Sequence, residues 1–459
     1  MSANWPSDRI EQYKKEGIKR VKLGVADIDG VLRGKYISLD KFSSVADDYF
    51  GFCDCIFGWD TDDQLYDNAR FTGWHTAYPD ALYRLDPNTE RRLKDEDNIP
   101  YYIGEFVASD GKNLHTICPR SLLQHVLNQA NELNYAVKMA FEYEFFIFNE
   151  TSHSVREKNY RNLIPLSPGN FGYSVLRAST YSHLFNELMD YCMDIDCPLE
   201  ALHCETGPGV WEAAINVDHA LAAADKAVLF KTFTKVFFQK RDLIATFMAK
   251  WSMDYPGQSG HCHQSLFDKD YRNNLFYDPD QPDNMSDLMK HYVAGQQKYL
   301  RPFLAMFAPT INSYTRLVKG AWAPTASTWG IENRTAALRV IPGSEKAQRL
   351  EFRIGSADAN PYLVAAANIA AGLLGIKEKL TLGDGVRGNA YEIQDELPES
   401  LQLPSNLRDA THIFKTSKEA QKIFGSDFVE HYVASREWEV RQYEQSINDW
   451  QLRRYFEII

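Results

Sequence analysis

Three short stretches place acidic and imidazole side chains at the spacing of a β-strand. They read F-E-Y-E-F at residues 141–145, G-Q-S-G-H-C-H at 257–263 and R-L-E-F-R at 349–353. Alternate side chains of a strand lie on one face, roughly 6.5–7 Å apart. The charged faces carry Glu142 and Glu144, His261 and His263, and Arg349, Glu351 and Arg353. Three strands of this kind predict a cavity that holds metal ions and phosphate groups.

Carboxylates and one imidazole are the candidate metal ligands. They are Glu142, Glu144, Glu205, Glu212, His261 and Glu351. Hard and borderline ligands of this kind favour magnesium or manganese over a thiolate zinc site. A single glutamate on a strand is usually a solvated surface residue, and His263 alone is compatible with a core histidine. The prediction therefore rests on the combination of these residues with arginines.

Several arginines follow in the second half of the chain: Arg316, Arg334, Arg339, Arg349 and Arg353. The planar guanidinium fork matches carboxylate and phosphate, so arginines facing metal-binding carboxylates suit phosphoryl transfer. The alternative is a set of surface salt bridges. Arg339 and Arg353 each lie between two apolar residues of a strand pattern, which disfavours that alternative. The chain has no G-x-x-x-x-G-K-S/T motif, so if it binds a nucleotide, a P-loop does not hold it.

The elements that position these residues are strands alternating with long helices from Pro119 onward. Residues 217–249 form the strongest helical stretch of the sequence, with Asp218 as its predicted N-cap. Asn360-Pro361 introduces an Ala- and Leu-rich helix that runs to about residue 379. Near the N-terminus, residues 20–38 predict a hairpin that turns at Asp29-Gly30. These elements indicate an α+β protein.

Length and composition exclude several classes of protein. A chain of 459 residues, 44% of them hydrophobic, predicts two domains with sizeable cores. The formal net charge of −12 argues against general nucleic-acid binding. No apolar run approaches the length of about 18 residues that a membrane span needs, and the first residues are polar, so we expect no membrane or secretory segment.

The cysteines favour a reduced, cytoplasmic setting. The chain has 7, an odd number, and they form no C-x-x-C pair. Cys262 lies between His261 and His263, but strand alternation turns it to the opposite face. We therefore expect Cys262 to be a buried structural thiol and not a metal ligand.

In these residues and in several longer motifs, the chain resembles the glutamine synthetase superfamily over nearly its whole length. The matching runs are F-E-Y-E-F at 141–145, H-C-E-T-G-P-G-V-W-E at 203–212, G-Q-S-G-H-C-H-Q-S-L at 257–266, N-S-Y-T-R-L-V at 312–318, A-P-T-A-S-T-W-G-I-E-N-R at 323–334, and R-L-E-F-R with A-N-P-Y at 349–362. Their order and spacing make the resemblance highly specific.

The resemblance implies a fold and an assembly. It implies an N-terminal β-grasp domain at 1–112 and a catalytic domain at 113–459, built on an antiparallel sheet flanked by helices. It also implies a homo-oligomer of stacked rings, a dodecamer, with active sites between neighbouring subunits. ATP and two or more divalent cations, Mg²⁺ or Mn²⁺, are the implied cofactors.

The resemblance also implies roles for individual residues. Glu144, Glu205 and Glu212 match the ligands of one metal, and Glu142, His261 and Glu351 match those of the other. Arg316, Arg353 and the backbone near Gly257 match the positions that bind glutamate. Arg334, Arg339 and Arg349 match phosphate-handling positions, and His263 and Ser265 lie where the family contacts ATP. The implied reaction converts the γ-carboxylate of glutamate to an acyl phosphate, which an amine then attacks.

One segment departs from the glutamine synthetases proper. Their flap over ammonia reads R-L-V-P-G-Y-E-A-P, whereas residues 316–324 read R-L-V-K-G-A-W-A-P, so Trp322 stands in place of a glutamate. An indole cannot take a proton from ammonium, and it adds apolar surface. The family's D-G-S-S is also missing from the first domain, where F-C-D-C-I-F-G-W-D stands near its place. These changes favour a larger, carbon-bearing amine such as a small alkyl- or arylamine.

Other readings of this departure stay open. Trp322 is also compatible with a packing role in the flap, while Asp54 or Asp60 serves ammonium as the catalytic acid or base. A polyamine acceptor would need carboxylates for its distal ammonium group. Some relatives of these enzymes have lost catalysis and act as structural or regulatory assemblies. The retained metal-matching carboxylates and arginines argue against such a loss.

Overall fold

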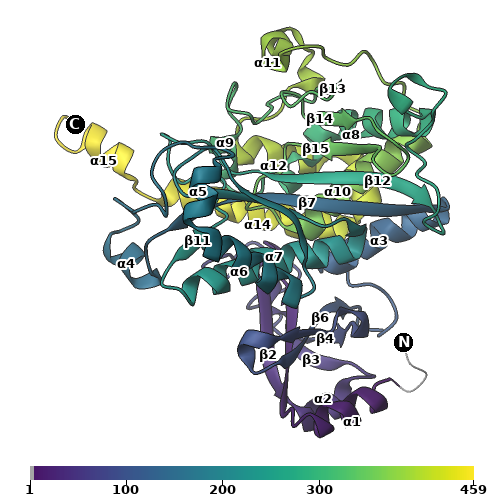
Figure 1. The fold of residues 1–459 in the computed structure, drawn as a ribbon, viewed down its shortest axis with the longest axis vertical. Helices are drawn as coiled ribbons and strands as arrows, with labels where there is room; N and C mark the ends of the chain where they lie inside the picture. The colour runs from purple at the N-terminus through teal and green to yellow at the C-terminus, as the bar shows by residue number, and fades with distance from the viewer. Residues whose placement is uncertain (1–4) are drawn as a thin grey trace.

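The computed structural model describes residues 5–459, which form two β-sheets with helices packed around them (Figure 1). The smaller sheet has the strand order β2-β1-β6-β4-β3, with β5 paired to β6. Its strands are β1 (Arg20–Ala26), β2 (Leu32–Ser38), β3 (Phe50–Cys53), β4 (Asp80–Leu85), β5 (Arg91–Leu93) and β6 (Ile99–Val107). Helices α1 (Ser7–Lys15) and α2 (Leu39–Val45) and the short 3-10 helices η1 (Asp54–Phe57), η2 (Pro87–Thr89) and η3 (Lys94–Glu96) belong to the same part.

The larger sheet runs in the order β13-β14-β15-β12-β7-β9-β8, and β10 and β11 also pair with β7. Its strands are β7 (Tyr135–Phe148), β8 (Leu199–Cys204), β9 (Val210–Ile215), β10 (Asp218–His219), β11 (Ile244–Thr246), β12 (Gly260–Asp268), β13 (Trp329–Ile331), β14 (Leu338–Ile341) and β15 (Arg349–Phe352). The pairs are antiparallel except β13 with β14. The expected α+β class, with a β-grasp sheet and a larger antiparallel sheet flanked by helices, is confirmed.

Helices cover the apolar face of the larger sheet. The main ones are α3 (Pro119–Glu132), α7 (Ala220–Gln239), α8 (Asp287–Phe307) and α10 (Pro361–Lys377). Strand alternation turns Phe141, Tyr143 and Cys262 toward them, and all three are buried. The Tyr143 ring stacks on Phe230 of α7, with ring centroids 6.2 Å apart. The opposite face of the sheet therefore remains for polar side chains, as the sequence predicted.

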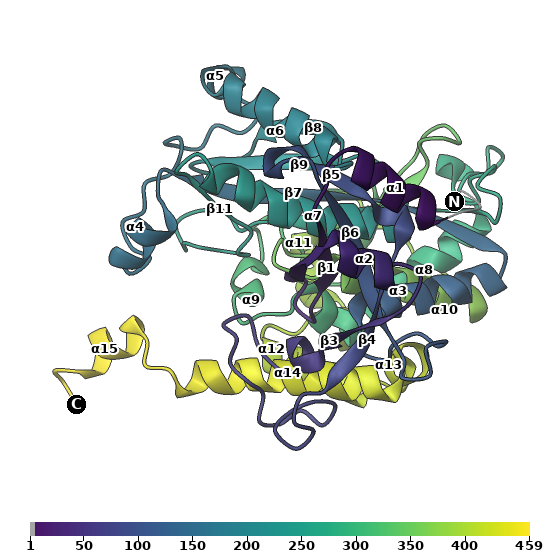
Figure 2. The ribbon, with the colours of Figure 1, turned by 90° about the horizontal axis from the view of Figure 1, so that it is seen from below.

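The remaining helices lie at the edges of the molecule and along the C-terminal end. They are α4 (Ser152–Glu157), α5 (Val175–Thr180), α6 (Ser182–Asp194), α9 (Ser313–Arg316), α11 (Ala390–Ile393), α12 (Leu407–Thr416), α13 (Lys418–Phe424), α14 (Ser426–Gln445) and α15 (Asp449–Tyr455). Short 3-10 turns are η4 (Pro282–Asn284), η5 (Gln394–Glu396) and η6 (Glu399–Leu401). Figure 2 shows α14 passing beneath the larger sheet and α15 projecting away from the body.

The predicted hairpin at 20–38 is confirmed, and its turn contacts the larger part of the molecule. Strands β1 and β2 pair from Arg20↔Ser38 to Ala26↔Leu32. The side-chain amide of Asn360 donates to the carbonyls of Asp27 and Ile28, at 3.2 and 3.1 Å. Gly30 has a φ of +81°, and a Cβ there would lie 3.1 Å from the Cα of Asn360. The turn therefore requires glycine both for its conformation and for this close approach.

A buried arginine joins the two parts of the fold. Arg120 of α3 forms ion pairs with Asp86 (2.8 Å) and Glu105 (2.6 Å) of the N-terminal part and with Asp225 of α7 (2.9 Å). Because Arg120 is 1% exposed, its charge is compensated by these carboxylates alone. The predicted domain boundary at 112/113 falls in the segment between β6 and α3. That boundary stays a prediction.

The strongest predicted helix is shorter in the structure. It spans Ala220–Gln239 and not 217–249, and the predicted N-cap Asp218 is wrong, since His219 occupies that position. Asp218 and His219 instead form β10 against β7, and the Asp218 carboxylate pairs with Lys226 at 2.7 Å. Residues Ile244–Thr246 join the sheet as β11. Pairing with β7 therefore overrides the helical pattern at both ends. The predicted helix at 361–379 is confirmed as α10, capped by the side chain of Asn360.

Candidate active site

Strand register brings the predicted acidic and imidazole residues together on the polar face of the larger sheet. His261 of β12 lies opposite Glu142 of β7. Glu144 of β7 lies opposite Glu212 of β9. Glu351 of β15 lies opposite His263 of β12. Directly opposed residues have Cβ atoms about 4.5–5.5 Å apart, so residues far apart in sequence become neighbours here.

One group of potential metal ligands consists of Glu142, His261 and Glu351. Their ligand atoms all lie within 4.8 Å of one another. Nδ1 of His261 is 3.4 Å from Oε1 of Glu351 and 3.7 Å from Oε2 of Glu142. The three side chains come from three adjacent strands, which makes the group rigid. They are the same three residues that the sequence resemblance assigned to one metal.

A second group consists of His203, Glu205 and Glu212, again within 4.8 Å of one another. Nε2 of His203 is 3.3 Å from Oε2 of Glu205 and 3.4 Å from Oε2 of Glu212. His203 was not predicted from the sequence. The signal was present, because His203 precedes Glu205 by two residues and shares its strand face. The ring of Tyr173 stacks on His203, with centroids 4.4 Å apart and planes 8° apart.

Glu144 lies beside the second group but outside it. It is opposite Glu212 in the ladder, and its Oε2 accepts a hydrogen bond from the backbone N–H of Ser259 at 2.5 Å. Burial, followed by repulsion from Glu212, raises the pKa of Glu144. The structure therefore gives Glu144 a carboxylate neighbour and a backbone donor. The predicted role of Glu144 as a metal ligand stays a prediction.

The electrostatics of the first group favour ionised carboxylates. Burial works to raise the pKa of Glu351, but the nearby charges of His261, Arg353 and His263 outweigh it and lower the pKa to about 2. Burial is likewise outweighed at Glu142, where hydrogen bonds from His261 and His263 hold the pKa well below its usual range. Both side chains therefore present acceptor oxygens at neutral pH.

The donor set fits divalent cations. Nε2 of His261 is buried without a hydrogen-bond partner among the described residues, and the long 3.3 Å contact between Nε2 of His203 and Oε2 of Glu205 leaves both of these buried atoms poorly satisfied. Buried polar atoms almost always have partners, so unsatisfied ones gathered at one site indicate a missing ligand. Carboxylate and imidazole atoms at this spacing suit Mg²⁺ or Mn²⁺, since the neighbouring cysteines, Cys204 and Cys262, are buried and alternate with the ligand residues.

Two of the predicted arginines contact the first group directly. One guanidinium nitrogen of Arg339 lies 2.9 Å from Oε2 of Glu351, and Arg353 pairs with Oε1 of the same carboxylate. Arg353 also donates through Nε to the carbonyl of Arg334, at 3.1 Å. The side chain of Arg334 is exposed and lines a cavity of about 600 Å³ beside Glu332. The guanidinium groups of Arg339 and Arg353 therefore lie beside the carboxylates, which is the arrangement predicted from the sequence. A role in phosphate handling stays a prediction.

Arg316 is buried next to Gly257. Arg316 is 3% exposed, and its guanidinium donates to the carbonyls of Ile354 and Arg353, at 2.8 and 3.2 Å. A Cβ on Gly257 would lie 2.6 Å from Cγ of Arg316, so only glycine leaves room for this side chain. Burial lowers the pKa of Arg316 to about 10, although the nearby Glu144 opposes this change. The structure thus brings together two of the residues predicted to bind glutamate.

A cavity of about 650 Å³ extends from the first group along β7 and β12. Glu142, His263, Ser265 and Arg349 line it, so the residues predicted to contact ATP share one space with a predicted metal ligand. Nε of Arg349 lies 3.3 Å from Nδ1 of His263, and Oγ of Ser265 donates to the carbonyl of Gln348 at 2.9 Å. The cavity is large enough for a small-molecule ligand.

Trp322 lies on an exposed loop. Its side chain is 64% exposed, and its φ of +57° places it in the left-handed region. Lys319, on the same loop, pairs with Asp395 at 2.7 Å. The flap at 316–324 therefore presents an indole to the solvent within a single chain.

Asp54 and Asp60 lie apart from the carboxylate groups within one chain. Asp54 is buried in the N-terminal part, where it accepts a hydrogen bond from the hydroxyl of Thr72 at 2.8 Å. Burial raises the pKa of Asp54. Asp60 accepts from the indole N–H of Trp438 in α14, also at 2.8 Å. A single subunit does not bring either residue to the site, so their predicted catalytic roles stay predictions.

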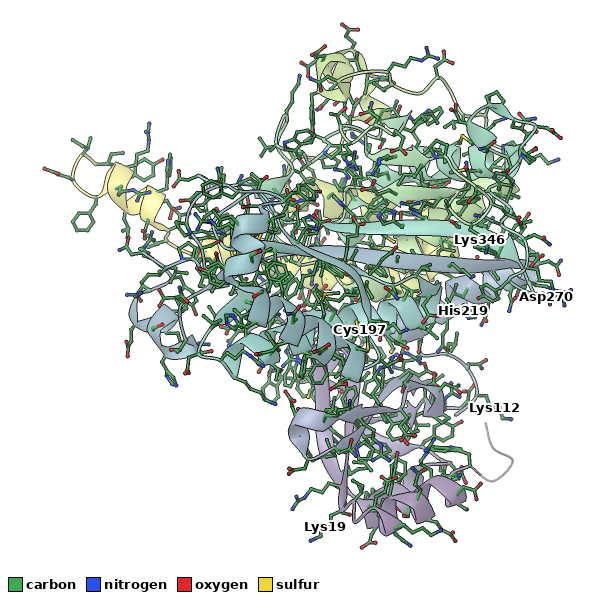
Figure 3. The ribbon with its side chains drawn as sticks, in the orientation of Figure 1. Lys19, Lys112, Cys197, His219, Asp270 and Lys346 are labelled. Atoms are coloured by element: carbon green, nitrogen blue, oxygen red, sulfur yellow. The ribbon has the colours of Figure 1, made fainter. Side chains whose placement is uncertain are left out.

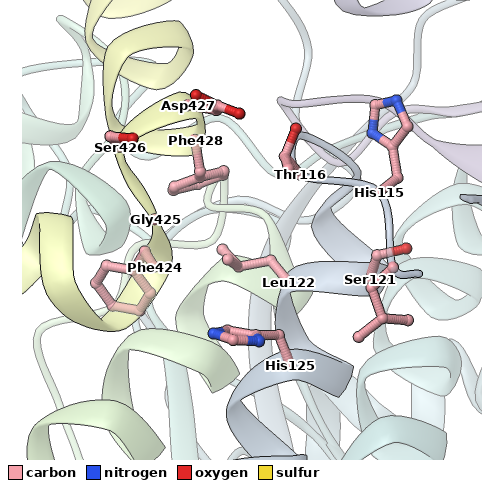
Figure 4. A pocket seen from close by; sticks show the side chains of 11 residues that line it. His115, Thr116, Ser121, Leu122, His125, Phe424, Gly425, Ser426, Asp427 and Phe428 are labelled. Carbon is pink, nitrogen blue, oxygen red and sulfur yellow. The ribbon is translucent and has the colours of Figure 1, made fainter. Parts of the chain in front are cut away.

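Another cavity lies between α3 and the junction of α13 with α14 (Figure 4). It has a volume of about 220 Å³, and its walls include Leu122, His125, Phe424 and Phe428. Its walls include none of the residues that the sequence predicted for the site. The larger cavity beside Glu142 is therefore the better candidate for substrates.

The structure shows the state of the cysteines and whether any described helix could cross a membrane. All seven cysteines, which lie within the described residues, are free, and Cys262 is fully buried. The expectation that Cys262 is a structural thiol fits this burial. Among residues 5–459, no helix combines the length and the apolar character needed to cross a membrane.

Comparison with known proteins identifies the family. The model of the glutamine synthetase catalytic domain matches residues 116–455. A type-1 glutamine synthetase 2 from Dictyostelium discoideum is 46% identical over 98% of this chain and 86% of its own length. A glutamate–isopropylamine ligase from a Pseudomonas species is 37% identical over 97% of this chain and 96% of its own.

A further relative and a solved structure extend the comparison. A gamma-glutamylethanolamide synthetase from Streptomyces coelicolor is 34% identical over 96% of this chain and 93% of its own. The ligand-free structure of GmaS superimposes with a TM-score of 0.84, at 25% identity, and covers 98% of this chain and all of its own. The carboxylate and arginine geometry and these matches agree: the chain belongs to the glutamine synthetase family of ATP-dependent ligases.

Proposed function

We propose that this protein joins an amine to the γ-carboxylate of L-glutamate at the expense of ATP. The reaction passes through γ-glutamyl phosphate and gives a γ-glutamylamide, ADP and phosphate. The observation that carries the proposal is the Glu142–His261–Glu351 group, whose Glu142 lines one cavity together with His263, Ser265 and Arg349. Divalent cations bound to the carboxylates would neutralise the triphosphate, and the arginines would stabilise the phosphoryl group during transfer.

The assignment of metal ligands follows the two groups. Glu142, His261 and Glu351 would hold one ion, and Glu205 and Glu212 would hold the other with help from Glu144 or His203. His203 extends the set of ligands that the sequence predicted. Burial lowers the pKa of His203, but hydrogen bonds to Glu205 and Glu212 outweigh it and raise the pKa to about 9. Without a metal, His203 therefore serves as the countercharge of these carboxylates.

The arginines near these carboxylates would bind either the phosphates of ATP or the carboxylates of glutamate. Arg339 and Arg349 adjoin the group around Glu351 and would contact the phosphates, together with the exposed Arg334. Arg316, which lies beside Gly257 and donates to the carbonyl of Arg353, would bind the carboxylates of glutamate together with Arg353. This arrangement holds the γ-carboxylate between the arginines and the terminal phosphate, which favours phosphoryl transfer by positioning.

We infer that the acceptor is a small apolar amine. Trp322 replaces a proton-accepting glutamate on the flap, and its indole is available because 64% of the side chain is exposed. Two relatives are named for carbon-bearing amines, isopropylamine and ethanolamine. An apolar flap residue discriminates in favour of alkyl or aryl groups and leaves ammonium without a partner.

Ammonia is the second candidate acceptor. The relative with 46% identity is named a glutamine synthetase, so overall similarity does not favour the larger amine. A polyamine acceptor would require the acidic residues near Asp60, but the Asp60 carboxylate is already engaged by Trp438 and Asp63 pairs with Arg33. A non-catalytic role is disfavoured by the retained carboxylate and arginine groups.

We propose that the active unit is a cytoplasmic homo-oligomer of stacked rings. Asp54 and Asp60 would then reach the site of a neighbouring subunit, since they do not reach the site of their own. Exposed apolar side chains at the C-terminal end support further subunit contacts, because such clusters usually mark interfaces. They include Ile447, Trp450, Phe456, Ile458 and Ile459.

The experiment is a coupled assay of phosphate release with ATP, L-glutamate and Mg²⁺, in which isopropylamine, ethanolamine, aniline, putrescine and ammonia are compared. Mass spectrometry of the product identifies the γ-glutamylamide. We expect release to require glutamate, an amine and the metal together. Phosphate release without any amide product, for every amine tested, would overturn the proposed function.

A further inference from the structure

The cavity beside the catalytic group continues along two paired strands toward an aromatic end. On β12, His261, His263, Ser265 and Phe267 alternate along one face, and β7 runs antiparallel beside it. With about 6.6 Å between alternate residues, Phe267 lies roughly 13 Å from His263. The row therefore leads from a predicted metal ligand, His261, past His263 and Ser265, which are predicted to contact ATP, to the apolar ring of Phe267.

Two further rings, those of Tyr271 and His219, lie together at this end. Tyr271 lines the cavity and stacks on His219, with ring centroids 3.9 Å apart and planes 3° apart. Nζ of Lys138 lies 4.5 Å from the centroid of Phe267 and 5.9 Å from that of Tyr271. Figure 3 labels His219, Asp270 and Lys346 near the same end of the larger sheet. The apolar side chain of Val217, 60% exposed, also lines the cavity.

The position of Tyr271 is fixed by the turn that follows β12. Its φ of +59° lies in the left-handed region, and its N–H donates to the carbonyl of Asp268 at 2.9 Å. The Asp268 carboxylate accepts from the backbone N–H groups of Arg272 and Asn273, at 2.8 and 3.2 Å. His219, on the other side of the stack, belongs to β10 and pairs with Lys138 of β7. Both rings are therefore held by backbone contacts before any ligand arrives.

The charge of the cavity suits an anion with a planar group. Its cationic lining residues are Lys138, Arg272, Lys346 and Arg349, and its carboxylates are Glu142, Glu200 and Glu345. The cations outnumber the carboxylates here, although the whole chain carries a formal net charge of −12. Phosphates at the end near Arg349 would place a base at the end near Tyr271.

We propose that Tyr271, held in place by His219, is the stacking platform for the purine base of ATP. This inference rests on the proposed function and adds a specific contact to it. One face of Tyr271 is covered by His219, while the ring still lines the cavity. A ring held in this way contributes stacking without losing much side-chain freedom on binding. Lys138, above Phe267, adds a cation beside the same base.

Calorimetric titration of MgADP and of magnesium tripolyphosphate separates base recognition from phosphate recognition. The Tyr271→Ala variant should raise the Kd for MgADP about tenfold or more, as expected for the loss of one base–aromatic stack. Its Kd for tripolyphosphate should stay within about twofold of the unmodified protein, because that ligand has no base. Tyr271→Phe keeps the ring and should bind MgADP like the unmodified protein. Tyr443→Ala, at an exposed tyrosine of α14, is the matched control.

The outcomes distinguish the inference from the proposed function. An unchanged Kd for MgADP in Tyr271→Ala, or an equal loss for both ligands, overturns the stacking role. If that variant fails to fold, His219→Ala is titrated instead, and it should weaken MgADP several-fold but not tripolyphosphate. An unchanged Kd in that second variant also overturns the role. If the unmodified protein binds neither ligand, the proposed function itself fails.

Discussion

Glu351 lies between two arginines and a histidine. Its Oε2 is 2.9 Å from a guanidinium nitrogen of Arg339, and its Oε1 contacts Arg353 and lies 3.4 Å from Nδ1 of His261. One carboxylate of the group that would hold a metal therefore contacts both Arg339, which would handle phosphate, and Arg353, which would bind glutamate. With 1% of its surface exposed, Glu351 has no access to compensating water.

Replacing Glu351 by glutamine should abolish most of the activity while preserving the fold. Glutamine keeps the volume and an oxygen but removes the charge that a metal and two guanidinium groups require. We expect kcat/KM to fall about 100-fold or more. The Mg²⁺ concentration needed for half-maximal activity should rise. The matched control is Glu332→Gln, because Glu332 also pairs with Arg339 but is exposed. Near-normal turnover of Glu351→Gln at low Mg²⁺ would refute the metal assignment.

Arg353→Lys tests the predicted contact with glutamate. Lysine keeps the charge but loses the planar fork that contacts Glu351 and the carbonyl of Arg334. We expect the KM for glutamate to rise and kcat to fall, with the KM for ATP little changed. Arg301→Lys on α8, where the guanidinium contacts the surface segment at Glu399 and Gln402, is the control. Unaltered saturation by glutamate would show that Arg353 makes no such contact.

The sequence predicted those parts of the site that follow from local patterns, and it did not predict contacts between segments far apart in the chain. Alternation along a single strand placed Glu142, His263 and Glu351 on the correct face, because that periodicity is local. His203 was missed although its spacing from Glu205 carried the same signal. The stack of His219 on Tyr271 joins segments far apart in the chain, so no local pattern reveals it.

The errors in the predicted elements have a similar cause. Asp218 has the right residue type for an N-cap, but tertiary pairing of Asp218–His219 with β7 displaces the helix start. The end of that helix was also misplaced, because Ile244–Thr246 pairs with the same strand. In the proposed oligomer, the positions of Asp54 and Asp60 relative to the site would depend on a neighbouring subunit, so neither a local sequence pattern nor a single chain tests their predicted roles.

The ion pairs of Arg120 predict a large effect on stability. Arg120→Ala leaves the buried carboxylate of Asp225 without its cation and Glu105 with Arg84 alone, and we expect the free energy of unfolding to fall by about 3–5 kcal/mol. Arg84 pairs with the same Glu105 but is 40% exposed along its side chain. Arg84→Ala should therefore cost only about 1 kcal/mol or less. Urea denaturation at one protein concentration measures both values, and similar values for the two variants would contradict the argument.

A buried histidine predicts how stability depends on pH. Burial lowers the pKa of His431 to about 4, against about 6.5 in the unfolded chain. Between these values the unfolded chain binds a proton that the folded chain does not. The free energy of unfolding should therefore fall as the pH is lowered from about 6.5 to about 4, by up to about 3 kcal/mol from this group.

Denaturation of His431→Phe over the same pH range isolates that contribution. Phenylalanine preserves the aromatic packing on Phe71 and Tyr66 but does not titrate. The stability of this variant should depend less on pH than that of the unmodified protein. His153→Phe, at an exposed position of α4, should leave the pH dependence unchanged. Parallel pH profiles for His431→Phe and the unmodified protein would exclude the role of His431.

The acceptor amine is tested most directly at Trp322. No group on the flap can deprotonate ammonium when an indole stands there, so ammonia should be a poor substrate. An alkylamine is also mostly protonated at neutral pH and needs a base, which Asp54 or Asp60 of a neighbouring subunit or Glu212 would supply. An arylamine is mostly unprotonated and can stack its ring on the exposed indole. The ratio of kcat/KM for aniline to that for isopropylamine should therefore fall as the pH rises.

Trp322→Glu should shift the preference toward ammonia, because a carboxylate on the flap can bind ammonium and take its proton. We expect the ratio of kcat/KM for ammonia to that for isopropylamine to rise by about tenfold or more, the effect of one well-placed charged contact of about 1.4 kcal/mol. Val318→Glu adds a carboxylate elsewhere on the same flap and should leave the ratio unchanged. A clear preference of the unmodified enzyme for ammonia would instead place it among the glutamine synthetases proper. A preference for putrescine would direct attention to the acidic residues at 60–63, since a diamine carries a second ammonium group that Trp322 cannot bind.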